Sequence, residues 1–434
     1  MTPELAGLLG LCLLLLLLIF LRMHIGLAMA SVGLLGLIYL EGMRKALGIL
    51  STTAYNTAAY YPVSVIPLFV FMGTIIAHSG LGDALYESAY KWFGHLKGGL
   101  AIATIAACTV FAALCGSSTA ETVTIGRIAL PEMRKYNYHD AFACGCVACA
   151  GSLAILIPPS IGFLIYGILT EQSIGLLFIA GILPGILLSL LFVLVVIITA
   201  FLNPNAAPQG SRSSMREKVS SLKVSGPVLA LLVLILGGIY FGFFTPTEAG
   251  AVGAFGAIVI TYVSGYMERK KFLASLLEAG SITAMILLLM IGAFIFMRFV
   301  TVSKLAFSIP EFIGRLGLSP YLVLSLIVVF YILFGMFFEI MSGMTLTLPL
   351  IYPIIVHLGF DPIWFGVVLV LLMEMGLATP PIGLNVFLLS TVTDVPMKTI
   401  FRGVWPFVGA IFVAIVIVVA FPKLALFLPA RMLR

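Results

Sequence analysis

Small polar residues and paired prolines interrupt the apolar segments of this sequence at two places. The first place holds "CGSSTAE" (Cys115–Glu121) and then "IPPS" (Ile157–Ser160). The second holds "EIMSGM" (Glu339–Met344) and then "ATPPIGLN" (Ala378–Asn385). Hydroxyl and carbonyl oxygens suit an alkali cation rather than a transition metal. A proline break also frees carbonyl groups for a cation and N–H groups for a carboxylate. These residue types therefore indicate sites for Na⁺ and for an organic anion.

The composition tells which kind of element must position these residues. Of the 434 residues, 62% are hydrophobic and 9% are charged, whereas about 25% are charged in a soluble protein. A water-soluble core cannot absorb so much apolar surface, so the composition predicts an integral membrane protein. The run 5–21 is too long for a barrel strand and predicts helices. We expect this run to be a retained span rather than a cleaved signal.

The apolar runs predict an all-α polytopic membrane protein with about ten full spans. Two further apolar regions, 99–131 and 321–357, are too long for one span and are interrupted near the middle by Gly, Ser and Pro. We expect each of them to be a re-entrant hairpin with a small, polar tip. The expected spans are 5–21, 26–42, 60–78, 141–169, 174–202, 227–244, 247–267, 280–300, 361–392 and 403–421.

Basic residues predict the orientation of these spans. The polar segment 203–226 and the cluster "ERKK" (Glu268–Lys271) are the most basic connections, and such connections are usually cytoplasmic. With both hairpins re-entrant, the two termini are then expected to be periplasmic, in a multi-pass protein of the bacterial inner membrane. The net charge of +6 is scattered, which is typical of cytoplasmic loops and does not indicate nucleic-acid binding.

The two interrupted places form an internal repeat. One sequence offset relates Pro158 to Pro380 and also Pro131 to Pro353. Each half is expected to hold five spans and one hairpin. Five is odd, so the two repeats would be inverted, which is typical of secondary transporters with an elevator-type division into scaffold and transport elements. We predict a first repeat 1–202 (scaffold spans 5–42, transport elements 60–169, hairpin 99–131), a cytoplasmic linker 203–226, and a second repeat 227–434 (scaffold spans 227–267, transport elements 280–392, hairpin 321–357).

An ordered set of motifs resembles the large membrane subunit of TRAP (tripartite ATP-independent periplasmic) transporters. The resemblance runs over nearly the whole chain. The motifs include "IPLFVFMGTIIAHSG" (Ile66–Gly80), "GSSTAETVTIG" (Gly116–Gly126), "IPPSIGFLIYG" (Ile157–Gly167), "TPTEAGAVGA" (Thr245–Ala254) and "GLATPPIGLNVF" (Gly376–Phe387). The family moves small organic anions, usually carboxylates, inward with the Na⁺ gradient by an elevator motion.

The resemblance implies partners and site residues. The partners would be a separate small four-helix membrane subunit, a periplasmic binding protein, a small organic acid anion and the lipid bilayer, with no nucleic acid. Na⁺ would be the coupling ion. Its implied ligands are Gly116, Ser117, Ser118, Leu156 and Pro158 at the first tip and break, and Ser342, Gly343, Gly376 and Thr379 at the second. The substrate would lie near Ser118, Thr119, Pro159, Ser160, Pro381 and Asn385.

Two departures from the family pattern affect these implied sites. Glu339 and Ile340 stand where many members have an Asp-Gly pair at the second tip. Ala154 and Ile155 replace a frequent Gly-Pro before the first break. Backbone ligands survive both changes, but the side-chain ligands at the second tip then differ from those of relatives.

Several other polar residues lie in or near the expected spans, and some of them admit two interpretations. Glu121 and Arg127 would either pair within the hairpin or border the substrate cavity, and Glu374 would either stabilise its helix or act in coupling. Thr245 and Glu248 resemble a helix capping arrangement. Arg298 is expected to snorkel towards a membrane surface. The six cysteines, including "CGCVAC" (Cys144–Cys149), are expected to be small apolar residues of packed helices.

Four other functions compete with the transporter subunit. A stand-alone Na⁺/organic-anion symporter would need no periplasmic partner. An intramembrane enzyme would need a convergent acid, base or metal set, and the sequence holds no HExxH or GxSxG motif. A structural subunit or a channel would not require two polar tips and two breaks at one offset. We therefore expect a transporter and not an enzyme.

Overall fold

The computed structural model describes residues 2–432, and this part of the chain is helical without any strand. The helices before the linker are α1 (Pro3–Phe20), α2 (Ile25–Glu41), α3 (Met43–Ala59), η1 (Tyr61–Ser64), α4 (Val65–Ser79), α5 (Leu81–Phe93), α6 (Gly99–Cys115), α7 (Ser118–Lys135), α8 (Asp140–Ala150), α9 (Leu153–Leu156), α10 (Ile161–Thr170) and α11 (Ile174–Leu202). Those after it are α12 (Met215–Tyr240), α13 (Pro246–Val263), α14 (Arg269–Val302), α15 (Leu305–Arg315), α16 (Pro320–Gly335), α17 (Ile340–His357), α18 (Pro362–Ala378), α19 (Leu384–Val392), α20 (Met397–Ala420), α21 (Lys423–Leu426) and η2 (Pro429–Arg431).

The apolar helices confirm a polytopic α-helical membrane protein. Within the described residues, eight helical segments are long and apolar enough to cross a membrane, or up to nine if the bent α12 counts as one span. The eight are Pro3–Phe20, Tyr61–Ser79, Asp140–Thr170, Ile174–Leu202, Pro246–Val263, Arg269–Val302, Ile340–His357 and Met397–Ala420. The predicted spans 26–42 and 361–392 contain the shorter apolar helices α2 and α18, the span 227–244 lies mostly in the bent α12, and Ile340–His357 comes from the second predicted hairpin.

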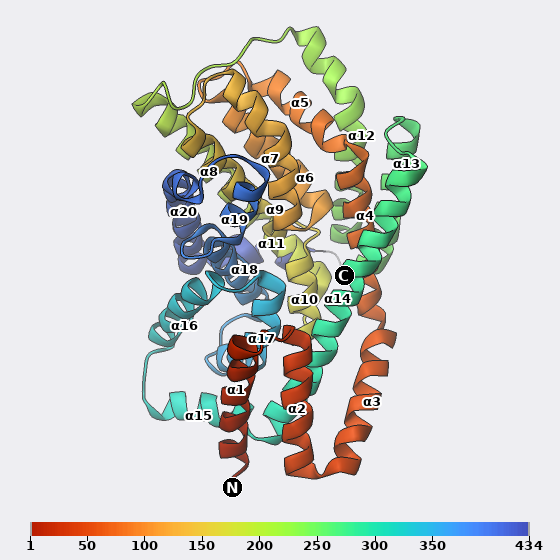
Figure 1. Ribbon diagram of the computed structural model, residues 1–434, viewed down its shortest axis with the longest axis vertical. Helices are drawn as coiled ribbons and strands as arrows, with labels where there is room; N and C mark the ends of the chain where they lie inside the picture. Colours follow the sequence, from red (N-terminus) through yellow and green to blue (C-terminus); the bar gives the residue numbers. More distant parts are fainter. Residues whose placement is uncertain (1, 433–434) are drawn as a thin grey trace.

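The molecule is elongated, and its two ends carry different parts of the chain (Figure 1). The start of α1 lies at one end with the turn between α2 and α3. The segment 203–214 and the start of α12 lie at the other end, beside α5. Residue 1 and residues 433–434 lie outside the described part of the chain. The periplasmic location of both termini therefore stays a prediction.

Each predicted hairpin region forms two successive helices, and their re-entry from one face of the membrane stays a prediction. α6 and α7 are joined at Gly116 and Ser117, and the Ser117 hydroxyl caps α7 by accepting the N–H of Ala120. α16 and α17 are joined by a short turn that ends at Glu339, whose carboxylate caps α17. A side-chain acceptor at each tip satisfies N–H groups that begin a helix inside an apolar environment.

Both predicted breaks are also present, at the paired prolines. The helix of the first broken span ends at Ala150 and resumes at Ile161, and α9 forms one short turn between these two residues. The second span ends at Ala378 and resumes at Leu384. The order hairpin and then broken helix occurs twice along the chain, as the sequence offset predicts. The inverted relation of the two repeats stays a prediction.

Close helix contacts hold the broken spans in place. A Cβ atom on Gly403 of α20 would lie 1.7 Å from the carbonyl oxygen of Ala141 in α8. Only glycine permits this backbone approach, which fixes the first broken span against α20.

Thr245 and Glu248 form a capping box at the start of α13, which confirms the interpretation of those two residues.

Three elements differ from the sequence expectation. α3 is a full helix although its segment is polar and was not predicted as a span. α15 is a short amphipathic helix that the apolar runs do not reveal. α12 begins at Met215 because Ser214 and Glu217 form a capping box, so the second half of the predicted linker is helical.

Candidate functional site

The tip of the first hairpin lies against the first helix break. Gly116 has φ +62°, in the left-handed region that favours glycine. A Cβ atom on Gly116 would lie 3.2 Å from the carbonyl oxygen of Pro159. Beside it, the hydroxyls of Ser117 and Thr119 lie 3.2 Å apart. The structure therefore brings the predicted residues Gly116, Ser117, Thr119 and Pro159 together.

The first break uses part of its own polar groups. The Ser160 hydroxyl donates to the carbonyl of Ile155 and accepts the N–H of Phe163 at 3.3 Å. The carbonyl oxygen of Leu156 lies 2.6 Å from the place of a Cβ on Gly181. Ser160 therefore acts as the cap of α10, and the Leu156 carbonyl is directed at α11. Pro158 between them is buried.

The second tip is organised by a carboxylate. The Oε2 atom of Glu339 accepts the N–H groups of Met341 and Ser342 at 3.0 and 3.3 Å. A Cβ atom on Gly343, one residue further, would lie 2.3 Å from the terminal methyl of Met373 in α18. Ser342 and Gly343 thus begin α17 next to the helix that leads to the second break.

The second break touches the second hairpin directly. A Cβ atom on Gly376 would lie 2.2 Å from the carbonyl carbon of Gly335 in α16. The hydroxyl of Thr379 donates to the carbonyl of Met375 at 2.6 Å. Each hairpin therefore lies against the broken helix of its own half of the chain.

A small pocket of about 140 Å³, here called the tip pocket, opens beside both tips. Ser117 and Thr119 reach it from the first hairpin, and Met341 reaches it from the second. Glu278 of α14 also lines the pocket, and its carboxylate lies 3.3 Å from Nε2 of His78 in α4. The other lining residues are Val70, Gly73, Thr74, Ala77, Cys115, Ala120, Ile161, Ile282 and Met285. Polar groups from the two halves therefore meet at one cavity.

Behind the first tip lies a buried group of polar side chains. The Ser118 hydroxyl lies 3.1 Å from the carbonyl oxygen of Gly151 and 3.4 Å from Oε2 of Glu374. It also accepts a hydrogen bond of 3.1 Å from Nδ2 of Asn385. Ser118 and Asn385, two predicted substrate residues, thus meet inside the protein, whereas Pro381 is exposed.

The buried group extends to residues of α7 that the sequence interpretation did not combine. Glu121 and Thr122 are fully buried, and they follow Ser118 by three and four positions. That spacing places all three on one face of a helix, a signal that could have been used. Arg127 is exposed and lies outside ion-pair distance of Glu121, as the described residues' ion pairs show.

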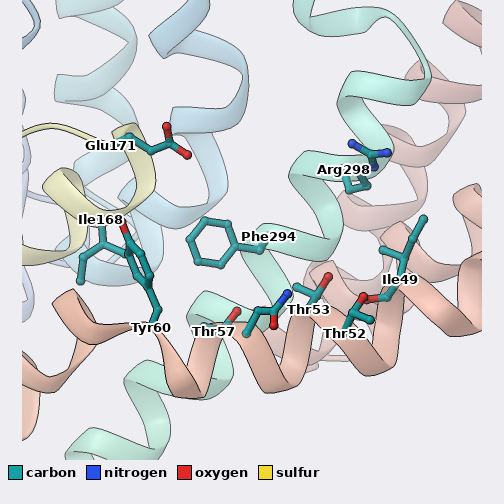
Figure 2. A pocket seen from close by; sticks show the side chains of 10 residues that line it. Ile49, Thr52, Thr53, Thr57, Tyr60, Ile168, Glu171, Phe294 and Arg298 are labelled. Carbon is teal, nitrogen blue, oxygen red and sulfur yellow. The ribbon is translucent and has the colours of Figure 1, made fainter.

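A larger pocket of about 500 Å³ lies between α3, α14 and the end of α10 (Figure 2). Figure 2 shows Arg298 and Glu171 on opposite sides of this pocket in that view, with the ring of Phe294 between them. No carboxylate of the described residues pairs with Arg298 within 4.0 Å. The pocket is also lined by Ile49, Thr52, Thr53, Asn56, Thr57, Tyr60 and Ile168.

The donor atoms at the two tips and breaks fit the cation that the family resemblance implies. They are hydroxyl and carbonyl oxygens, with glycines that let the backbone approach closely. Residues 2–432 contain no group of three or more His, Cys, Asp or Glu side chains that could hold a metal ion. Such an oxygen set suits a hard cation such as Na⁺ better than a transition metal.

Comparison with known proteins identifies the family. Residues 12–424 match the family described as "Tripartite ATP-independent periplasmic transporter, DctM component". The chain is 39% identical to the C4-dicarboxylate TRAP transporter large permease protein DctM of Pseudomonas aeruginosa, over 88% of this chain and 89% of that protein. It is 32% identical to the sialic acid large permease protein SiaM of Vibrio cholerae, over 85% and 86%, and to the ectoine large permease protein TeaC of Halomonas elongata, over 86% and 87%.

Solved structures share the fold at low sequence identity. The YdaH transporter of Alcanivorax borkumensis matches with a TM-score of 0.66 and 16% identity, over 99% of this chain and 98% of that one. MtrF of Neisseria gonorrhoeae matches with a TM-score of 0.58 and 15% identity, over 89% and 85%. The family match and the curated relatives confirm the predicted resemblance: the chain belongs to the DctM component, or large permease, family of tripartite ATP-independent periplasmic transporters.

Proposed function

We propose that the chain takes up a small organic anion together with Na⁺, as the large permease of a three-part system. The observation that carries this proposal is the tip pocket, where hydroxyls of the first tip and the start of α17 face one cavity. α7 begins beside this cavity, so its N-terminal N–H groups and positive dipole end favour a carboxylate there. The tip pocket is the substrate site in this proposal.

Each tip and its break hold one Na⁺ in this proposal. Gly116 and Ser117 with the carbonyl of Pro159 form the first site, and Ser342, Gly376 and Thr379 form the second. The cations offset the charge of the anion, which would otherwise oppose its burial. A net inward positive charge also draws on the membrane potential, at about 2.3 kcal/mol per charge and 100 mV.

The tip pocket and the larger pocket contact α14 at two different positions along its length. Glu278, in the tip pocket, lies on the half of α14 that begins at the basic cluster, and Arg298, in the larger pocket, lies on the other half. Glu278 and Arg298 are twenty residues apart, which corresponds to about 30 Å along an α-helix. We propose that the anion meets Arg298 first, from the periplasmic side.

The remaining parts follow the family. Residues 1–202 and 227–434 act as inverted repeats, and their hairpins and broken helices move together against the scaffold in an elevator motion. A small four-helix subunit completes the membrane complex, and a periplasmic binding protein delivers the anion. Relatives are named for C4-dicarboxylates, sialic acid and ectoine, so these compounds are the first substrates to examine.

The proposal is tested by reconstitution. The chain and its small subunit are placed in liposomes, with the binding protein outside and a labelled anion chosen by thermal-shift screening of that protein. Uptake should require an inward Na⁺ gradient and increase with an inside-negative potential. Uptake that ignores Na⁺ would refute the coupling. Full uptake of free anion without the binding protein would favour the stand-alone symporter.

A further inference from the structure

The buried group behind the first tip contains oxygen atoms that accept no hydrogen bond from an N–H or O–H group of residues 2–432. These atoms are both carboxylate oxygens of Glu121, Oγ1 of Thr122, Oε1 of Glu374 and Oδ1 of Asn385. All four residues are fully buried, with 0% of their surface exposed. An unpartnered buried polar group destabilises the folded state, and a charged one does so more strongly. A bound cation coordinated by the lone pairs of these oxygen atoms would stabilise them.

Contacts between three elements bring Thr122, Glu374 and Asn385 together around Ser118, and Glu121 precedes Thr122 on the buried face of α7. Ser118 of α7 lies 3.4 Å from Glu374 of α18 and 3.1 Å from Asn385 of α19. The Ser118 hydroxyl also lies 3.1 Å from the carbonyl oxygen of Gly151. A Cβ atom added to Gly151 would lie 2.1 Å from Oγ1 of Thr122, so Thr122 lies beside the same residue. Ser118 is therefore the centre of a cluster to which the first hairpin and the second broken helix both contribute.

The cluster has acceptor atoms and no protein cation. It offers two carboxyl groups, an amide oxygen and hydroxyls, all of them hard oxygen ligands. Among residues 2–432, no Lys, Arg or His lies within 4.0 Å of Glu121 or Glu374. A carboxylate buried without a partner in this way is strongly unfavourable. A bound monovalent cation removes that cost and uses the free oxygens as ligands.

We propose that Glu121, Thr122, Glu374 and Asn385 form a further Na⁺ site, separate from the two tip–break sites. This inference rests on the proposed function and adds one coupling ion to it. With one carboxyl group ionised, a single Na⁺ leaves the site uncharged and fit to move within the membrane. Because the ligands come from both halves, the cation ties α7 to α18 and α19 while it is bound.

The test compares glutamine variants with wild type, because glutamine imitates a carboxyl group that is permanently neutral. The double variant E121Q/E374Q, in the complex with the small subunit, should bind one Na⁺ fewer per chain in equilibrium binding of ²²Na⁺. Its thermal stabilisation by NaCl over choline chloride should weaken as well. Glu248→Gln, at an exposed helix cap, should leave both measurements as in wild type.

Unchanged Na⁺ stoichiometry in the double variant would overturn the site and indicate two neutral carboxyl groups. If the double variant does not fold, Thr122→Val, which exchanges a hydroxyl for a methyl group of similar size, takes its place. Weaker Na⁺ binding by Thr122→Val supports the site, and wild-type binding overturns it. A wild-type complex that binds no Na⁺ would instead refute the proposed function as a whole.

Discussion

Replacing Gly376 by alanine should push the second break away from the second hairpin. The added Cβ atom would lie 2.2, 2.5 and 2.6 Å from the C, Cα and O atoms of Gly335. Ordinary contact begins at 3.4 Å, so α16 and α18 must separate by about 1.2 Å (3.4 − 2.2) if the new atom is to fit. All three atoms belong to the backbone, so no side-chain rotation can relieve the overlap.

The energetic effect can be bounded from known substitutions. Overpacking of this kind costs about 1–3 kcal/mol. Alanine regains at most about 1 kcal/mol over glycine through helix propensity, and less near a helix end. We expect a net loss of about 1–2 kcal/mol of stability. Since Thr379, three residues further on, donates to the carbonyl of Gly376 at 3.1 Å, the second tip–break site should also widen and need more Na⁺ for half-maximal uptake.

The assay is thermal unfolding of the purified complex in lipid nanodiscs, together with Na⁺-dependent uptake in liposomes. Gly409→Ala is the matched control, because Gly409 also lies within an apolar helix but a Cβ atom there meets nothing within 4 Å. The control should keep or raise the unfolding midpoint, and Gly376→Ala should lower it. Equal midpoints and equal Na⁺ dependence for the two variants would refute the close contact of α16 and α18.

Three further substitutions test other parts of the structure. Ser117→Ala should raise the Na⁺ concentration for half-maximal uptake, and an unchanged Na⁺ response would exclude the Ser117 hydroxyl as a ligand of the first cation site. Arg298→Gln should raise the apparent KM for the anion, with kcat less affected, and Arg298→Lys should recover part of the loss; an unaltered KM would exclude an early anion contact. Thr245→Ala, which breaks the capping box with Glu248, should cost about 1 kcal/mol of stability without a change in Na⁺ dependence; thermal unfolding that matches wild type would show the cap to be dispensable.

The local features of the fold could be predicted from the sequence because local chemistry determines them. Paired prolines cannot continue a helix, so the breaks at Pro158 and Pro380 follow from residue type alone. Gly116 and Ser117 mark the first tip because a left-handed glycine and a capping hydroxyl end one helix and begin the next. α3 was missed because its polar residues hide a helix that packs against α14 and borders a pocket.

Contacts in the candidate site are of two kinds, those within one half of the chain and those between the two halves, and only the first kind could be predicted from the sequence. Each tip–break contact joins residues of one half, such as Gly116 with Pro159, and the repeated offset predicts such pairs. Other contacts cross between the halves, such as Ser118 with Asn385, which lie 267 positions apart. No local pattern fixes which faces of two distant helices meet. Ser118 and Asn385 were therefore both predicted as site residues, while their mutual contact was not.

The crossing contact also bears on how the proposed cations would be coupled. A cation held by one tip and one break depends on half of the molecule, so it can bind or leave when that hairpin alone shifts. A cation among Glu121, Glu374 and Asn385 depends on both halves, because α7 belongs to the first and α18 and α19 to the second. Its release requires the two halves to separate. Such a site links the two tip–break sites energetically, since filling it stabilises the arrangement in which both hairpins lie against their breaks and face the same pocket.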